Sequence, residues 1–157
     1  GVILNVYSLG GDIVSVFRII QVLKESNLVV LAYVEYGYSG AFLIPELTAS
    51  KIYINTWGIY GFYHNSTGDW QPNHGYPEAW KTSFDYVSQQ VALNRHLNLN
   101  YTRNALGYVY LGQKAVDIGF ADKVVSSLDE VKDYSRQIWG QDIAFECMQV
   151  SGLYCYE

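Results

Sequence analysis

The first part of the chain alternates short apolar runs with glycine turns and amphipathic stretches. An apolar run over residues 2–6 leads to the pair Gly10 and Gly11, which predicts a buried strand and a tight turn. Residues 12–25 carry apolar side chains at helical spacing, and the aspartate that opens this stretch suits the positive end of a helix. A second apolar run, residues 28–36, leads through a Gly-Tyr-Ser-Gly turn into an apolar helix over residues 41–47. This order predicts an α/β domain with a parallel sheet and right-handed crossovers.

The rest of the chain shows shorter elements and one long loop. Two short strands are expected over residues 51–55 and 59–63, on either side of a Thr-Trp-Gly corner. Glycine, proline, asparagine and aspartate gather between residues 65 and 77, and loops of this length often bind a ligand. Beyond the loop the pattern predicts a long helix, a short helix, a last strand and a final helix with a Ser-x-x-Glu capping box, over residues 78–97, 112–119, 120–125 and 127–139.

Length and composition indicate one domain with its own core. We place the domain at residues 1–139 of the 157 and treat residues 140–157 as a C-terminal tail. Half of the residues are hydrophobic and 16% are charged, which is not the composition of a disordered segment. The net charge is −5 and the basic residues are scattered, which argues against nucleic acid as a partner. No apolar run approaches the ~20 residues of a membrane span, so we expect a soluble chain whose compartment stays open.

The two ends of the chain carry less information. The chain opens at Gly1 directly on an apolar run, which indicates a processed or excised product, truncated before strands that would precede it. Cys147 and Cys155 both lie in the tail, where two free thiols and a tail-closing disulfide are equally compatible with the sequence.

Two glycine turns follow strands whose carboxyl ends meet at one edge of a parallel sheet, where α/β folds bind their ligands. At the first turn, Gly10 and Gly11 let the backbone approach a ligand and can aim N–H groups at an oxyanion, although on their own they are more typical of a plain strand-to-helix turn. The second turn places the hydroxyl of Ser39 on a sharp corner, with the N–H of Gly40 as another oxyanion donor. The alternative is that Ser39 is only the N-cap of the next helix.

A serine nucleophile needs a base within hydrogen-bond reach, and the chain has three histidines. His64 stands at the end of an expected strand where the long loop begins, so it is either a base or a loop anchor. His74 lies in the loop beside a glycine and is typical of a turn, whereas His96 has polar neighbours and is typical of a solvated helix face.

Four segments, in the right order, carry a resemblance to a known family. They read Asn-Val-Tyr-Ser-Leu-Gly-Gly at 5–11, Tyr-Ser-Gly-Ala-Phe-Leu-Ile at 38–44, Ala-Ser-Lys-Ile-Tyr-Ile-Asn at 49–55 and Leu-Gly-Gln-Lys-Ala-Val-Asp-Ile-Gly-Phe-Ala-Asp at 111–122. These segments resemble the Clp protease proteolytic subunit and signal peptide peptidase A, over residues 2–125. The resemblance implies the ClpP/crotonase-like fold, an α/β architecture whose parallel sheet is built from repeated ββα and βα units with flanking helices.

The resemblance also implies the activity of a serine peptidase acting on peptides or proteins. Ser39 carries over as the nucleophile, and the backbone N–H groups of the two glycine turns carry over as oxyanion donors. In the Clp type a histidine follows the serine by about 25 residues, which matches His64 and makes it our first choice of base. In the signal-peptide-peptidase type the base is a lysine, for which Lys81 corresponds. The resemblance implies no metal or cofactor, and it implies a homo-oligomer.

Two departures from the family pattern support alternatives. The acidic residue that orients the histidine falls near Gly107, which has no side chain, so Asn104 and, second, Asp69 are the substitutes. Pro45 lies in the helix after Ser39 and implies a kink or a short helix. A catalytically inactive scaffold or binding protein is therefore the alternative function. Acyl-thioester chemistry with coenzyme A is a third, disfavoured because no acidic residue stands at the second glycine turn.

Overall fold

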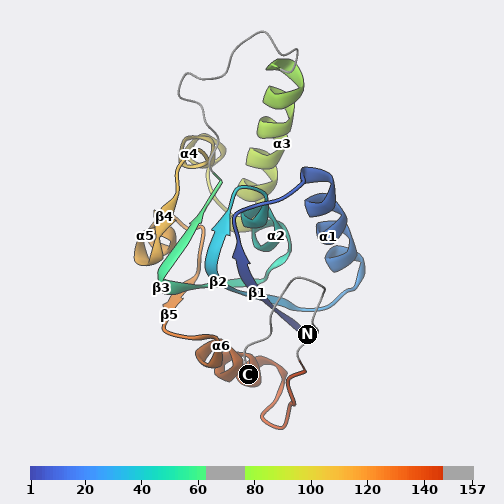
Figure 1. Cartoon of the computed structure of the whole chain (residues 1–157), viewed down its shortest axis with the longest axis vertical. Coiled ribbons are helices and arrows are strands. Elements are labelled where there is room, and N and C mark those ends of the chain that lie inside the picture. Colours follow the sequence, from blue (N-terminus) through green and yellow to red (C-terminus); the bar gives the residue numbers. More distant parts are fainter. Residues whose placement is uncertain (63–76, 147–157) are drawn as a thin grey trace.

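The computed structural model describes residues 1–62 and 77–146, with side chains from residue 84 onward in the second range. In the first range β1 (Val2–Ser8), α1 (Ile13–Glu25), β2 (Val30–Tyr38), α2 (Gly40–Thr48) and β3 (Lys51–Gly61) alternate. The second range contains α3 (Pro77–Arg95), α4 (Leu99–Ala105), β4 (Tyr110–Leu111), α5 (Gly112–Asp117), β5 (Lys123–Val125) and α6 (Leu128–Trp139), as Figure 1 shows.

The strands form one sheet in the order β1-β2-β3-β4, and β5 also pairs with β3. The pairs β1–β2, β2–β3 and β3–β5 are parallel, whereas the two-residue β4 pairs antiparallel with β3. The expected α/β domain with a largely parallel sheet is therefore confirmed. Both of the long apolar runs expected as buried strands are strands of this sheet, and β2 lies between β1 and β3.

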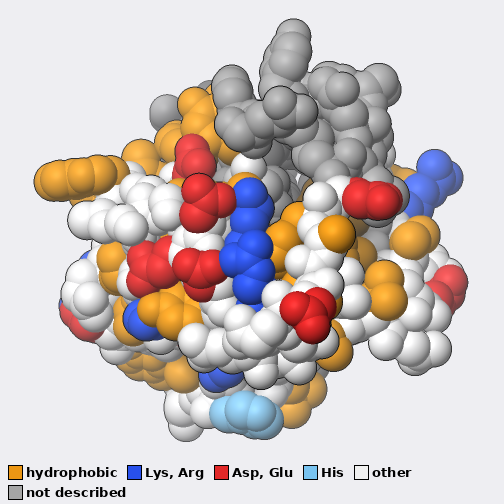
Figure 2. Space-filling model, turned by 90° about the horizontal axis from the view of Figure 1, so that it is seen from below, with side chains coloured by type: hydrophobic (Ala, Val, Ile, Leu, Met, Phe, Trp, Pro, Cys, Tyr) orange, Lys and Arg blue, Asp and Glu red, His pale blue; other side chains and the backbone are white. Residues whose placement is uncertain are grey.

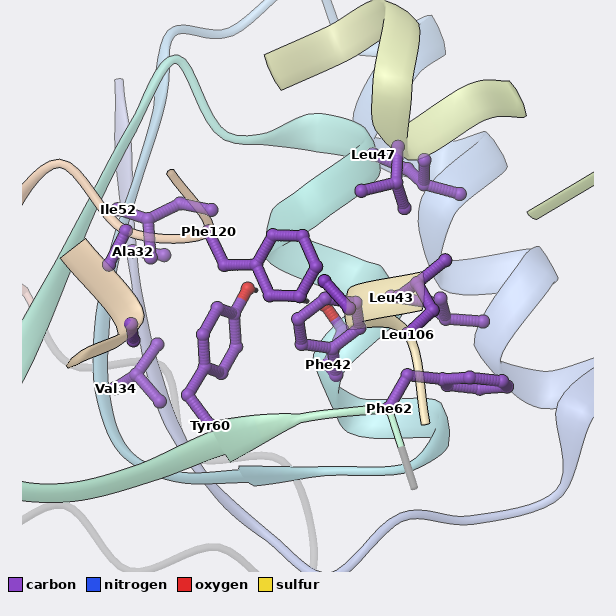
Figure 3. Packing of buried hydrophobic residues seen from close by; sticks show 14 of the residues in the cluster. Ala32, Val34, Phe42, Leu43, Leu47, Ile52, Tyr60, Phe62, Leu106 and Phe120 are labelled. Carbon is purple, nitrogen blue, oxygen red and sulfur yellow. Dashed lines mark hydrogen bonds between the residues drawn. The ribbon is translucent and has the colours of Figure 1, made fainter. Parts of the chain in front are cut away.

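Successive side chains of β2 and β3 point to opposite faces of the sheet, and each face carries a hydrophobic core. On one face, Ala32, Val34, Ile52 and Ile54 are fully buried against the helices. Figure 3 shows Phe42 of α2 at the centre of this core, with its ring 4.7 Å from that of Tyr60 and 5.2 Å from that of Phe120. On the other face a smaller core contains Leu31, Tyr33, Tyr53, Val125 and Val131, and α6 covers it.

Side-chain caps begin the helices where the sequence places them. Asp12 accepts hydrogen bonds from the N–H and hydroxyl of Ser15, which fixes the start of α1. At α6, Ser127 accepts from the N–H of Glu130, as a capping box requires. The reciprocal bond lies one residue earlier than expected, because the Glu130 carboxylate accepts from the N–H of Ser126.

The structure differs from the sequence expectation at β3 and at α4. The two strands expected around the Thr-Trp-Gly corner form the single strand β3, whose pairing with β2 passes from Val34–Ile54 to Tyr36–Ile59. The corner is thus a bulge within one strand. Helix α4 was not expected; it begins where Asn98 accepts from two backbone N–H groups. Helix α2 is short, nine residues long, as Pro45 predicts, because proline lacks the N–H that would reach the carbonyl of Ala41.

Among the helices of the described ranges, none has both the length and the apolarity to cross a bilayer. Figure 2 shows one face of the molecule, on which acidic and basic side chains are interspersed among hydrophobic ones.

Candidate functional site

The two glycine turns meet at the carboxyl ends of β1 and β2. The parallel register pairs Ser8 with Gly37, so the chain leaves both strands at the same edge of the sheet. A methyl group added to Gly10 would lie 3.2 Å from the Cβ of Ser39, and one added to Gly40 would lie 3.4 Å from the carbonyl oxygen of Gly11. The turns therefore touch, and glycine at both positions permits this approach.

Ser39 occupies a strained corner. Its φ is +53° and its ψ is −121°, a conformation that residues with a side chain rarely adopt and that costs about 1–3 kcal/mol. Its N–H donates to the carbonyl of Gly61 at 3.1 Å, and its carbonyl accepts from the N–H of Phe42 at 3.2 Å. Its side chain makes no N-cap bond, so the capping role does not explain the serine. A serine held by its backbone on a strained strand-to-helix turn has the geometry of a nucleophile elbow.

The backbone donors around Ser39 differ in what they already bind. The N–H of Gly10 donates to the hydroxyl of Ser8 at 3.2 Å. The N–H groups of Gly11 and Gly40 have no hydrogen-bond acceptor among the residues described. Of the three glycines expected as oxyanion donors, Gly11 and Gly40 are therefore the ones whose N–H groups have no partner within the described part of the chain.

The candidate proton acceptors lie largely beyond the described part of the chain. His64, Asp69 and the loop histidine His74 are outside it. Lys81 belongs to α3 by its backbone, but its side chain is also outside it. Asn104 is exposed on α4 and, within the described ranges, forms no hydrogen bond with the Ser39 turn.

Behind the Ser39 turn, α2 buries a carboxylate that the sequence analysis missed. Glu46 is completely buried, and neither of its carboxylate oxygens has a hydrogen-bond donor among the described residues. The nearest cation is Arg95 of α3, whose Nε lies 3.8 Å from the carboxylate. Burial raises the pKa of Glu46 to about 8, and the charge of Arg95 only partly opposes this rise. One acidic residue in the otherwise apolar helix Gly40–Thr48 was the signal in the sequence.

Arg95 connects this carboxylate to the chain before β5. It donates to the carbonyl of Gly119 at 3.1 Å and pairs with Asp122 at 3.0 Å. Asp122 also pairs with Lys51 at 3.1 Å and accepts from the N–H of Ile52 at 2.8 Å. Burial alone would raise the pKa of Asp122, but these donors and charges outweigh it and lower the pKa. The network fixes α2, α3 and β3 relative to one another behind the candidate nucleophile.

The described ranges contain no group of three or more histidine, cysteine, aspartate or glutamate side chains that could hold a metal ion.

Comparison with known proteins gives matches among solved structures. No family model and no curated protein matches the chain. A peptidase from Plasmodium falciparum superposes with a TM-score of 0.62 at 16% identity, over 80% of this chain and 77% of that one. Two structures of the 1510-N membrane-bound stomatin-specific protease give TM-scores of 0.68 and 0.66 at 18% and 16% identity. They match over 85% of this chain and over 64% and 68% of theirs.

The chain has the fold of these peptidases. At such identities the likeness concerns the fold, and it confirms the expected ClpP-like architecture. One of the two stomatin-specific protease structures carries a lysine-to-alanine change at position 138 and is bound to a substrate peptide. The other carries a serine-to-alanine change at position 97.

Proposed function

We propose that the chain is a serine peptidase in which Ser39 is the nucleophile. The observation that carries this proposal is the strained corner at Ser39, whose side chain makes no cap bond and which packs against the Gly10–Gly11 turn. The peptidases that share the fold support the same general activity.

The geometry supports a two-step acyl transfer. The Ser39 oxygen attacks the peptide carbonyl while a base takes its proton, and the base then returns the proton to the leaving amine. The N–H groups of Gly11 and Gly40 hold the tetrahedral oxyanion, and one such donor contributes about 10²–10³ to the rate. Water, activated by the same base, hydrolyses the acyl-enzyme and restores the serine.

Two residues compete for the role of the base. His64 follows Gly61, whose carbonyl accepts from the N–H of Ser39, by three residues in the sequence, which supports it as a candidate. The changed serine and lysine of the stomatin-specific protease stand 41 positions apart, and Lys81 follows Ser39 by 42. This spacing favours Lys81, and we propose it as the base with His64 as the alternative. A lysine in this role requires a pKa lowered by burial.

Cleavage of a quenched fluorescent peptide library by the whole chain tests the proposal. Ser39→Ala should abolish cleavage, and Lys81→Ala should abolish it while His64→Ala retains it. Lys24→Ala, which removes a lysine from the last turn of α1, is the matched control and should cleave as the unchanged protein does. Loss in His64→Ala alone would transfer the role of base to the histidine. Cleavage by Ser39→Ala at the original rate would contradict the proposal, and peptide binding without any cleavage would indicate a scaffold.

Self-association remains a prediction of the family resemblance. Val14 and Val22 of α1 are 54% and 64% exposed, which supports an apolar contact between copies. Sedimentation velocity over a range of protein concentrations should show a species larger than one chain. A single monomeric species at every concentration would refute this expectation.

A further inference from the structure

A cavity of about 520 Å³ lies where the ends of β1 and β2 meet the bulge of β3 and the start of α6. Four aromatic side chains, one carboxylate and one amide line it, next to the start of α6. These six residues are Tyr7, Tyr33, Tyr36, Trp57, Glu35 and Asn55. Trp57 and Tyr7 are 82% and 70% exposed, so aromatic surface at this cavity is open to solvent. Neither Ser39 nor the glycines of the two turns belong to its described lining.

The bulge of β3 builds one wall of this cavity. The side-chain amide of Asn55 donates to the hydroxyl of Tyr33 at 2.9 Å and to the carbonyl of Ser126 at 3.3 Å. The side-chain oxygen of Asn55 accepts from the N–H of Trp57 at 2.9 Å. A methyl group on Gly58 would lie 2.9 Å from the carbonyl oxygens of Asn55 and Val34, so glycine is needed for the bulge to close. These contacts hold the backbone in the shape that leaves the Trp57 indole at the rim.

The lining has the chemistry of a site for a cation. The rings of Tyr7 and Tyr36 are tilted against each other with centroids 6.1 Å apart, and aromatic faces attract positive charge. Among the described residues that line the cavity, Glu35 alone carries a formal charge, and none is a lysine or arginine. The net charge of −5 on the whole chain adds to the attraction.

The position of the cavity near Ser39 favours a polypeptide side chain as its ligand. Tyr36 stands three residues before Ser39 on β2, which is about 10 Å along a strand. An extended polypeptide at the Ser39 turn could therefore place a side chain here within three or four residues. We propose that this aromatic pocket binds a lysine or arginine side chain of a polypeptide, with Tyr7, Tyr36 and Trp57 around the cation and Glu35 as its counter-charge.

The inference is tested without turnover, on the whole chain carrying Ser39→Ala. N-acetyl-lysine amide is titrated against ¹⁵N-labelled protein, and the indole N–H signal of Trp57 is assigned by its loss in Trp57→Phe. The signal should shift and saturate with the lysine derivative and should not respond to the neutral N-acetyl-norleucine amide. This binding measurement does not depend on hydrolysis. The binding proposal can therefore be refuted while the peptidase proposal stands, and the peptidase proposal can be refuted while lysine binding is confirmed.

The counter-charge is tested by a matched pair of variants. Glu35→Gln should weaken binding of the lysine derivative about threefold, the effect of losing one exposed ion pair. Glu25→Gln removes the same charge at the exposed end of α1 and should leave the affinity unchanged. Equal binding of the norleucine derivative, an unmoved Trp57 signal, or full affinity in Glu35→Gln would each overturn the proposal.

Discussion

Replacing Glu46 by glutamine should stabilise the protein relative to the unchanged chain, and this advantage in the free energy of unfolding should grow as the pH rises. The Glu46 carboxyl is completely buried, and among the described residues it has no hydrogen-bond donor and no close cation except Arg95, at 3.8 Å. Its pKa is raised from the ordinary value of 4.5 to about 8, chiefly because burial disfavours the charged form. At neutral pH the folded protein therefore holds a proton on Glu46 that the unfolded chain has released.

The size and sign of the effect follow from this difference. Each pH unit between the unfolded and the folded pKa lowers the free energy of unfolding by about 1.4 kcal/mol. The contribution of Glu46 is fully present below pH 4.5 and is lost as the pH rises towards 8. At pH 7 the loss amounts to about 3 kcal/mol. Glutamine cannot ionise, so Glu46→Gln should gain on the unchanged protein by this amount between pH 5 and 7, and the gain should level off above pH 8.

Urea unfolding followed by circular dichroism at pH 5, 6, 7 and 8 measures this difference. The slope against pH is the decisive quantity, because it cancels any constant effect of replacing a carboxyl by an amide. Glu25→Gln, at the exposed end of α1, should run parallel to the unchanged protein. A difference that does not vary with pH, or one in which Glu46→Gln loses stability as the pH rises, would refute the reasoning. The second result would mean that Glu46 is ionised and held by Arg95.

Three further changes have defined outcomes. Gly10→Ala places a methyl group 3.2 Å from the Cβ of Ser39 at a φ of +124°, so it should cost about 1–3 kcal/mol in urea unfolding and reduce peptide cleavage. Gly11→Ala, with nothing within 4 Å of the added methyl group, should leave the free energy of unfolding unchanged, and an equal loss in both variants would contradict the steric argument. Asp122→Asn should lower the free energy of unfolding at pH 7 by about 1–3 kcal/mol, and the deficit should shrink as the pH falls through the lowered pKa of Asp122; a constant deficit would contradict its ionised role. Asn55→Ala removes three hydrogen bonds at the β3 bulge and should weaken N-acetyl-lysine amide binding, whereas unchanged affinity would show that the bulge does not shape the pocket.

Local signals in the sequence were sufficient for much of the fold. The apolar runs at the start of β1 and within β2 identify both strands, and Asp12 marks the start of α1. Burial was predicted correctly for β2 but not for β1, which lies at the end of the sheet order and has no buried residue. The meeting of the Gly10–Gly11 and Ser39–Gly40 turns also follows from sequence, because parallel strands joined by a helix end at the same edge.

Other features depend on contacts between distant segments. The Thr-Trp-Gly corner reads as a break between strands, yet pairing with β2 on both sides keeps β3 continuous. Glu46 resembles a surface position until α3 brings Arg95 against it. The aromatic pocket combines β1, β2, β3 and the start of α6, and no short stretch of sequence contains it.

The role of Ser39 is tested most directly by a fluorophosphonate probe, which forms a covalent bond only with an activated serine. The account predicts one label per active chain, located on Ser39 by mass spectrometry of the digested protein, and none on Ser39→Ala. Absence of labelling in the folded, unchanged protein, or equal labelling of Ser39→Ala, would contradict the hydrolytic mechanism.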